Sequence, residues 1–162
     1  MSGVTVQLAG RLAARGDVAL GDRCSVDRTM QVVGNRTAML LIREAFYGAT
    51  RFEQLAKRVG VTEAVASQRL KELVAAGILA KQPYREPGQR TRFEYVLTPA
   101  GHELMPVLLG LLQWGARHLP HPGGRVTVTH DECGAEVQAA LRCADGHDVP
   151  EEDVVVRGDV TR

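Results

Sequence analysis

Apolar positions between residues 39 and 76 recur at the spacing of α-helices. The stretch TAMLLIREAFYG is apolar at 39–42 and again at 45–47, which is typical of a helix buried on most sides. In RFEQLAKRVG the apolar residues keep helical spacing up to Gly60, and Thr62 is a good cap for the next helix. The apolar stripe of that next helix consists of Ala66, Leu70, Leu73 and Val74. Because only residues 60–62 separate the last two helices, the pattern predicts a helix-turn-helix.

After residue 77 the helical spacing gives way to two short runs rich in apolar and aromatic residues. ILAKQPY (78–84) and TRFEYVL (91–97) each predict a strand, and the intervening REPGQR holds a Pro-Gly turn. Further helices are predicted at 25–33 and at 99–118.

Capping residues and prolines mark the ends of these two flanking helices. Ser25 is expected to cap the first, while Thr98 caps the second with Pro99 at its first position. Pro106 and Gly110 are expected to bend the second helix. The order of helix, helix-turn-helix, two-stranded wing and helix predicts a mainly α fold with a small β-wing, the winged helix-turn-helix.

The two ends of the chain do not continue this pattern. Residues 1–22 mix small and charged residues with several glycines, so we expect a partly ordered N-terminal arm. HLPHPGG (118–124) is typical of a linker, and strands are expected in RVTVT (125–129) and DVVVR (153–157). The predicted organisation is therefore an arm at 1–22, a winged helix domain at 23–120 and an acidic, β-rich C-terminal extension at 121–162.

Composition favours an intracellular protein. The chain has 162 residues, 44% of them hydrophobic, which suffices for one domain with a small appendage. No apolar run reaches the roughly 18 residues that cross a bilayer, and the N-terminus lacks the apolar segment of a secretory signal. Three widely spaced cysteines do not form a disulfide framework. We therefore expect a cytoplasmic protein that does not contact membranes.

Charge is distributed unevenly along the chain. Residues 36–92 carry eleven Lys and Arg against five Asp and Glu, whereas residues 130–162 carry three against nine. A basic middle suggests a polyanionic partner, although an ordinary solvated surface would also account for it.

The second helix of the helix-turn-helix leaves one face free for the major groove of double-stranded DNA. Candidate contacts at its start and on that face are Thr62, Ala64, Ser67, Gln68 and Lys71. Gln68 could bond adenine in bidentate fashion, and Lys71 is better placed to reach phosphate.

Cations of the predicted wing form a second group of candidates. The hairpin tip carries Arg85, Gln89, Arg90 and Arg92, where a wing presents cations to the DNA backbone or the minor groove. Arg51, at the start of the preceding helix, could contact phosphate as well. Each residue alone could be a solvated surface group, but their coincidence with a helix-turn-helix predicts DNA binding.

Five stretches within residues 24–115 resemble the HxlR-type winged helix regulators, a bacterial group related to the MarR family. They are CSVDRTMQVVGNR, LLIREAFYGATRFEQLAKRV, VASQRLKELVAAGIL, RFEYVLTPAG and LLGLLQWG. The resemblance implies a homodimeric transcription factor on a near-palindromic operator, with repression the commoner mode of action. It also implies that the first and last helices of the domain build the dimer, so that 23–120 serves both DNA binding and dimerisation.

Two positions depart from the family pattern. Thr37 stands where the family usually has a Trp, so packing there must differ. Ala64 stands where a basic residue is frequent, so base preference is expected to differ as well.

Cys24 matches the cysteine that begins the family pattern. Similar cysteines in several members sense quinones, aldehydes or hypochlorite, which implies a small-molecule or electrophile effector. Arg23 and Arg28 lie close in sequence and would favour the thiolate, while Asp22 and Asp27 offset them. The alternative is a small buried residue at the dimer interface.

The acidic extension contains two pairs of metal-binding residue types. His130 with Cys133 and Cys143 with His147 could supply four ligands to a structural zinc ion. Some longer relatives end in Cys-Gly and then Cys-x-x-Cys, whereas this chain has Gly146 three residues after Cys143, so His147 must substitute. The alternative is a strand-turn-strand appendage with two reduced cysteines.

No constellation typical of an enzyme is recognisable. The sequence lacks a nucleophile–base pairing, a glycine-rich phosphate loop and a paired carboxylate motif, so we expect neither catalysis nor an obligatory cofactor. The remaining alternative is a winged helix protein-interaction module that no longer binds DNA. The wing arginines and Gln68 argue against it.

Overall fold

The computed structural model describes residues 6–120 and 122–158. Within these ranges the chain forms two compact units. One unit is continuous, Asp22–Val128, and the other combines the described residues before 22 with those after 128.

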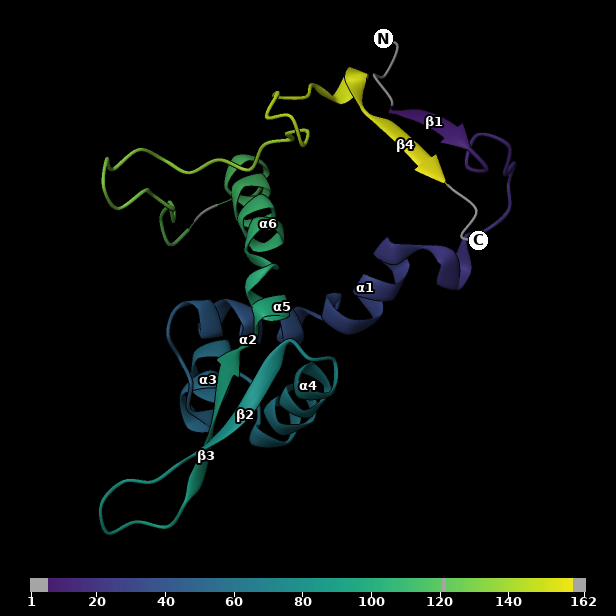
Figure 1. Ribbon diagram of the computed structural model, residues 1–162. Helices are drawn as coiled ribbons and strands as arrows, with labels where there is room; N and C mark the ends of the chain where they lie inside the picture. Colours follow the sequence, from purple (N-terminus) through teal and green to yellow (C-terminus); the bar gives the residue numbers. More distant parts are fainter. Residues whose placement is uncertain (1–5, 121, 159–162) are drawn as a thin grey trace. The chain divides into compact units, whose positions relative to one another are not determined.

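The continuous unit is a winged helix domain (Figure 1). Its helices are α1 (Ser25–Val33), α2 (Arg36–Phe46), α3 (Phe52–Val59), α4 (Glu63–Ala75), α5 (Pro99–His102) and α6 (Met105–His118). Its strands are β2 (Leu79–Tyr84) and β3 (Arg92–Leu97). The element order confirms the predicted winged helix-turn-helix.

The core lies between α2, α3, α4 and the first residues of β2. Its largest fully buried side chains are Leu41, Ile42, Leu55, Leu70, Leu73 and Leu79. The stripe predicted for α4 is confirmed, since Ala66, Leu70 and Leu73 are buried and Val74 packs against the core. Burial of this stripe fixes which face of α4 points outward.

The caps at the starts of the helices differ in part from expectation. Thr62 accepts a hydrogen bond from the Val65 amide at 3.4 Å, as predicted. Cys24, and not Ser25, occupies the cap position of α1, and its side chain makes no capping hydrogen bond. Asn35 caps α2 by accepting from the amides of the two residues at 37 and 38.

The helix predicted at 99–118 is interrupted rather than bent. α5 ends at His102 and α6 begins at Met105. Pro106 has no amide hydrogen to donate to the carbonyl of His102, so the chain breaks one turn before the proline.

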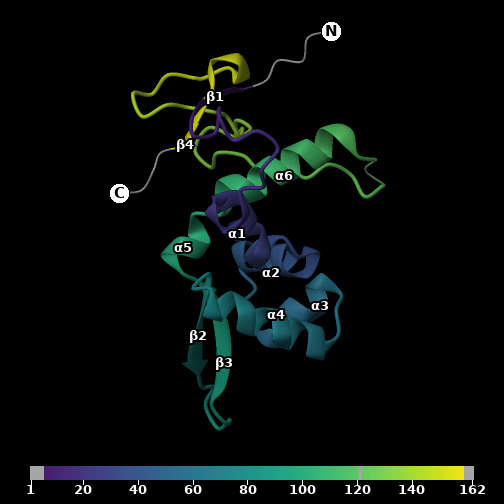
Figure 2. The same ribbon diagram turned by 90° about the vertical axis from the view of Figure 1, so that its right-hand side faces the viewer.

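The β2–β3 hairpin is antiparallel, with Leu79 opposite Leu97 and Tyr84 opposite Arg92. It extends beyond the helices in both views (Figures 1 and 2). The Tyr95 amide donates to the carbonyl of Thr50 at 2.7 Å, and Arg51 forms an isolated bridge with Glu94. The wing is therefore joined through backbone bonds to the segment that precedes α3.

The second unit brings the two ends of the chain together. β1 (Gln7–Gly10) and β4 (Val155–Gly158) pair in parallel, with Gln7 opposite Val155. A strand close to the predicted 153–157 is confirmed, but the predicted strand at 125–129 was wrong. Only Thr129 of that stretch pairs, in an isolated bridge with Glu136. Val126 is 59% exposed, so its side chain gains little from burial in an extended strand there.

Candidate DNA-binding surface

The outward face of α4 carries most of the side chains predicted to contact DNA. Ala64, Gln68 and Lys71 are exposed at positions i, i+4 and i+7, which places them on one side of a helix. Thr62 is exposed at the cap, and Ser67 is half-buried on the flank. This face combines short side chains near its start with hydrogen-bonding groups further along.

Gln68 does not project freely in the unbound protein. Its amide nitrogen donates to the Glu72 carboxylate at 2.8 Å, and Arg69 donates to the other oxygen at 2.5 Å. The hydrogen bond from Gln68, followed by that from Arg69, holds the pKa of Glu72 below its ordinary value. Base contact by Gln68 thus requires the amide to leave a charged carboxylate. The i,i+4 and i,i+3 spacings could have revealed this network from sequence.

Val65 is a further residue on this helix that sequence reasoning missed. It is 42% exposed, although it belongs to the first turn of α4. An exposed branched aliphatic side chain here is suited to contact a thymine methyl group. Val65 lies outside the apolar stripe of α4, and this position in the sequence could have indicated that its side chain is exposed.

The loop between β2 and β3 presents the predicted wing residues. The Arg85 guanidinium donates to the Gln89 carbonyl at 3.2 Å, which closes the loop across its tip. Arg90 is exposed. Arg92 lies 3.9 Å from Glu53 across an exposed pair, a distance at which the ion pair contributes little. These cations are thus available to a polyanion.

Arg51 is held at the base of the wing. Its guanidinium pairs with Glu86 at 2.7 Å and lies 4.0 Å from the centre of the Tyr84 ring. The hydrogen bond to Glu86 raises the pKa of Arg51 above its ordinary value. Contact with phosphate would require Arg51 to exchange this partner, so its role in the free protein is to hold the wing loop against the start of α3.

Cys24 lies half-buried at the start of α1 as a free thiol. Its carbonyl accepts from the Arg28 amide at 3.0 Å, so the backbone of Cys24 belongs to the first turn of the helix.

Helices α1 and α6 expose a group of large apolar side chains. These are Val26 and Met30 on α1 with Val107, Leu111 and Trp114 on α6. A cavity of about 520 Å³ separates the two helices, and Met30, Val33 and Leu111 are among the residues that line it. We call these five exposed residues the α1–α6 apolar face.

A model of the HxlR-like helix-turn-helix family matches residues 32–122, more than half of the chain. The chain belongs to the HxlR-like helix-turn-helix family. A Mycobacterium tuberculosis relative, the uncharacterized HTH-type transcriptional regulator Rv3095, is 39% identical over 120 residues, 74% of this chain and 75% of the relative.

Solved structures agree with this assignment. The crystal structure of PA1607, described as a candidate transcription factor, is 30% identical with a TM-score of 0.72, covering 88% of this chain and 97% of that one. The redox regulator HypR in its oxidised form is 27% identical with a TM-score of 0.55, covering 60% of this chain and all of HypR. Such relatives are transcriptional regulators rather than enzymes. Within the described ranges, none of the helices of this HxlR-like protein is long and apolar enough to span a membrane.

The four predicted zinc ligands lie in two separate turns of the HxlR-like protein. Nδ1 of His130 lies 3.3 Å from Sγ of Cys133, while the Cys143 amide donates to the His147 carbonyl at 3.0 Å. In the described part of the chain, no three His, Cys, Asp or Glu side chains are grouped to hold a metal. Among the described residues, the structure therefore brings together one pair of the four predicted ligands, whereas a structural zinc site uses four.

Proposed function

We propose that the protein is a transcriptional regulator that binds double-stranded DNA sequence-specifically as a cytoplasmic homodimer and represses by occluding its operator. The observation that carries this proposal is the polar outward face of α4 beside an exposed basic wing. Buried leucines hold α4 in place, and backbone bonds hold the wing to the segment that precedes α3. Both elements are thus positioned before DNA arrives.

The residues of this surface divide between base and backbone contacts. Gln68 reads adenine, with Thr62, Ala64 and Ser67 close to base edges in the major groove. Lys71, Arg85, Gln89, Arg90 and Arg92 contact phosphates or the minor groove, and Arg51 joins them if it exchanges Glu86 for phosphate.

The α1–α6 apolar face is the proposed dimer interface. Five large apolar side chains exposed on two helices that end the domain would be shielded from water by a second copy. A two-fold interface repeats the same recognition helix on both sides, which matches a near-palindromic operator.

Selection of bound sequences from random duplex DNA, followed by binding titrations at several salt concentrations, tests the proposal. We expect Gln68→Ala to lose about 1–3 kcal/mol on the selected operator and nothing on random duplex. Gln138→Ala, an exposed glutamine of the other unit, is the matched control. If no duplex is bound even at low salt, the domain is a protein-interaction module instead.

We also propose that modification of the Cys24 thiol by electrophiles or oxidants lowers operator affinity. The similarity to a redox regulator and the half-exposed position of Cys24 support this role. Operator affinity is measured with and without diamide or a quinone in the wild type and in Cys24→Ser, with Cys133→Ser as the control. If diamide or a quinone still lowers the operator affinity of Cys24→Ser, Cys24 is not the sensing residue.

A further inference from the structure

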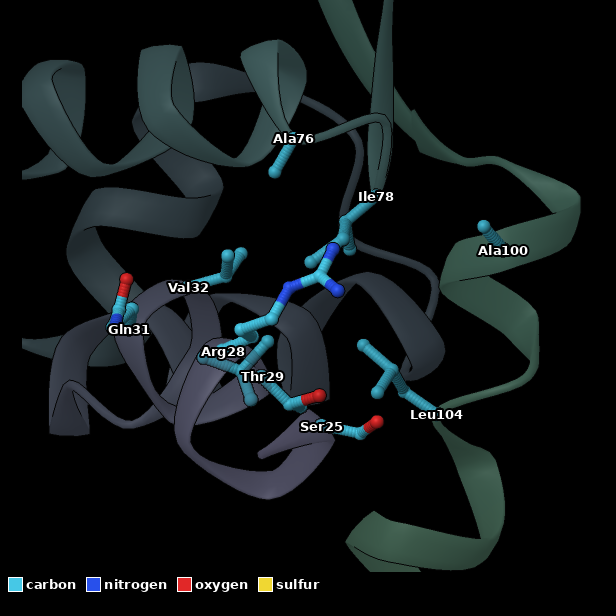
Figure 3. A pocket seen from close by; sticks show the side chains of 10 residues that line it. Ser25, Arg28, Thr29, Gln31, Val32, Ala76, Ile78, Ala100 and Leu104 are labelled. Carbon is cyan, nitrogen blue, oxygen red and sulfur yellow. The ribbon is translucent and has the colours of Figure 1, made fainter. Parts of the chain in front are cut away.

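The β1–β4 sheet of the second unit leaves its large apolar side chains exposed. In the winged helix unit, apolar side chains from different elements lie together, as around the hollow that Val32, Ile78 and Leu104 line (Figure 3). By contrast, the register partners Leu8 and Val156 of the β1–β4 sheet are 48% and 39% exposed. Parallel sheets are normally buried on both faces, and two strands alone are marginally stable. The described part of one chain therefore leaves this sheet incomplete.

One edge of β4 is open for hydrogen bonding. Figure 1 shows β4 beside β1, and no other strand of the described chain pairs with it. The carbonyls of Val154 and Gly158 accept hydrogen bonds of 2.9 and 3.2 Å from the β1 side. Because the backbone groups of successive residues in a strand point to opposite sides, those of Val155 and Arg157 point away from β1. The open edge therefore presents two amides and two carbonyls.

The sequence along this edge is complementary to itself. Residues 153–157 are Asp-Val-Val-Val-Arg. If a second copy of the strand runs antiparallel about a two-fold axis at Val155, each valine lies opposite a valine and Asp153 lies opposite the partner's Arg157. Opposite charges and β-branched side chains that face each other directly across two strands both stabilise the pairing. A second copy of β4 thus fits this edge in charge and in shape.

Backbone geometry favours the same register. Val155 directs its amide and carbonyl to the open edge, so the two copies of Val155 exchange two hydrogen bonds across the axis. The Arg157 amide then meets the carbonyl of the partner's Asp153, which adds two more bonds by symmetry. The Asp153 amide already donates to the Pro150 carbonyl at 3.0 Å, so the pairing ends there. Centring the axis one residue earlier or later would place a charged side chain opposite Val155.

We propose that the open edge of β4 is a self-association surface, on which two copies of the chain pair antiparallel about Val155. The pairing joins two β1–β4 sheets into one sheet of four strands. Leu8, Val154 and Val156 of both copies then share one face of that sheet, which supplies the continuous apolar surface that two strands lack. This inference goes beyond the proposed function, because it depends neither on DNA binding nor on the α1–α6 apolar face.

Disulfide trapping in the full chain tests the register directly. The three native cysteines are first replaced by serine. Val155→Cys is then expected to give covalent dimers on mild oxidation, because its two Cα atoms would lie about 5.5 Å apart across the axis. Val156→Cys is the matched control on the same strand. Its two copies would each lie opposite Val154, farther apart than the roughly 7 Å that a disulfide can span.

Charge reversal in the Val155→Cys background gives a second test. Arg157→Asp places carboxylates opposite each other at both ends of the pairing, so the yield of trapped dimer should fall about tenfold. Adding Asp153→Arg inverts both ion pairs and should restore trapping. Arg15→Asp makes the same change of charge at an exposed arginine of the same unit, and should leave trapping unchanged.

Three results would overturn the proposal. The first is the absence of trapped dimer from Val155→Cys, and the second is equal trapping by Val156→Cys, which would indicate random collision. The third is trapping of Arg157→Asp at the native yield, which would show that the charges do not select the register. Since the trapped bond reports the β4 edge alone, a chain that is trapped but binds no DNA would refute the proposed function and leave this pairing in place.

Discussion

Replacing Gly101 by alanine probes how tightly α5 packs against the start of the wing. Gly101 is buried, and an added Cβ would lie 2.3 Å from the carbonyl oxygen of Ile78 and 3.0 Å from Cδ2 of Leu97. That carbonyl also accepts from the Thr98 amide at 3.0 Å, so it cannot retreat without weakening a hydrogen bond. Overpacking of this kind costs about 1–3 kcal/mol of unfolding free energy, and the weakened hydrogen bond adds about 1 kcal/mol.

Gly110 offers a matched control within α6. An added Cβ at Gly110 meets no atom within 4 Å, and alanine is favoured over glycine in a helix by about 0.5–1 kcal/mol. Gly110→Ala should therefore equal or exceed the wild type in stability. The same substitution is thus expected to have opposite signs at the two sites.

Urea unfolding followed by far-UV circular dichroism measures both variants. This signal reports the winged helix unit, because all of the described α-helices belong to it. Gly101→Ala is expected to lower the unfolding midpoint without changing the slope, and to lower the melting temperature by roughly 4 °C or more per kcal/mol. If Gly101→Ala were as stable as Gly110→Ala, this result would contradict the close packing of α5 against the Ile78 carbonyl.

Further predictions concern the core, the DNA surface and the acidic unit. Leu70→Ala should lose about 2–5 kcal/mol of unfolding free energy in the same assay, because Leu70 is fully buried; a loss below 1 kcal/mol would contradict the packing of α4. Lys71→Ala should weaken operator and random duplex alike and reduce the salt slope by about one. Untagged protein should contain clearly less than one zinc per chain by metal analysis. One equivalent of zinc that is lost in Cys133→Ser or Cys143→Ser would refute this.

Local sequence patterns predicted most of the elements of the winged helix domain. The stripe of α4 repeats every three to four residues, so its buried face follows from sequence alone. Thr62 and the Pro-Gly turn act on their immediate neighbours, and both lie where expected. The exposed residues of α4 could be named for the same reason, since the face opposite a buried stripe is known once the stripe is known.

Contacts between distant segments were not foreseeable from such patterns. Arg51 pairs with Glu86, 35 residues later, a contact that no local pattern predicts. β1 pairs with β4 from the opposite end of the chain, although no strand was predicted at β1 and nothing local links the two runs. The two pairs of predicted zinc ligands stay apart for a related reason, since correct spacing within each turn does not bring two turns together.

By itself the sequence determined the helix-turn-helix, the wing and the outward face of α4, because hydrophobic period, caps and turns are encoded within a few residues. Tertiary structure alone decided that Arg51 pairs with Glu86 and that β1 pairs with β4. The physical reason is that a charged side chain gains its role from its neighbours in space. Arg51 and Glu86 are neighbours only because the β2–β3 hairpin lies against the segment that precedes α3.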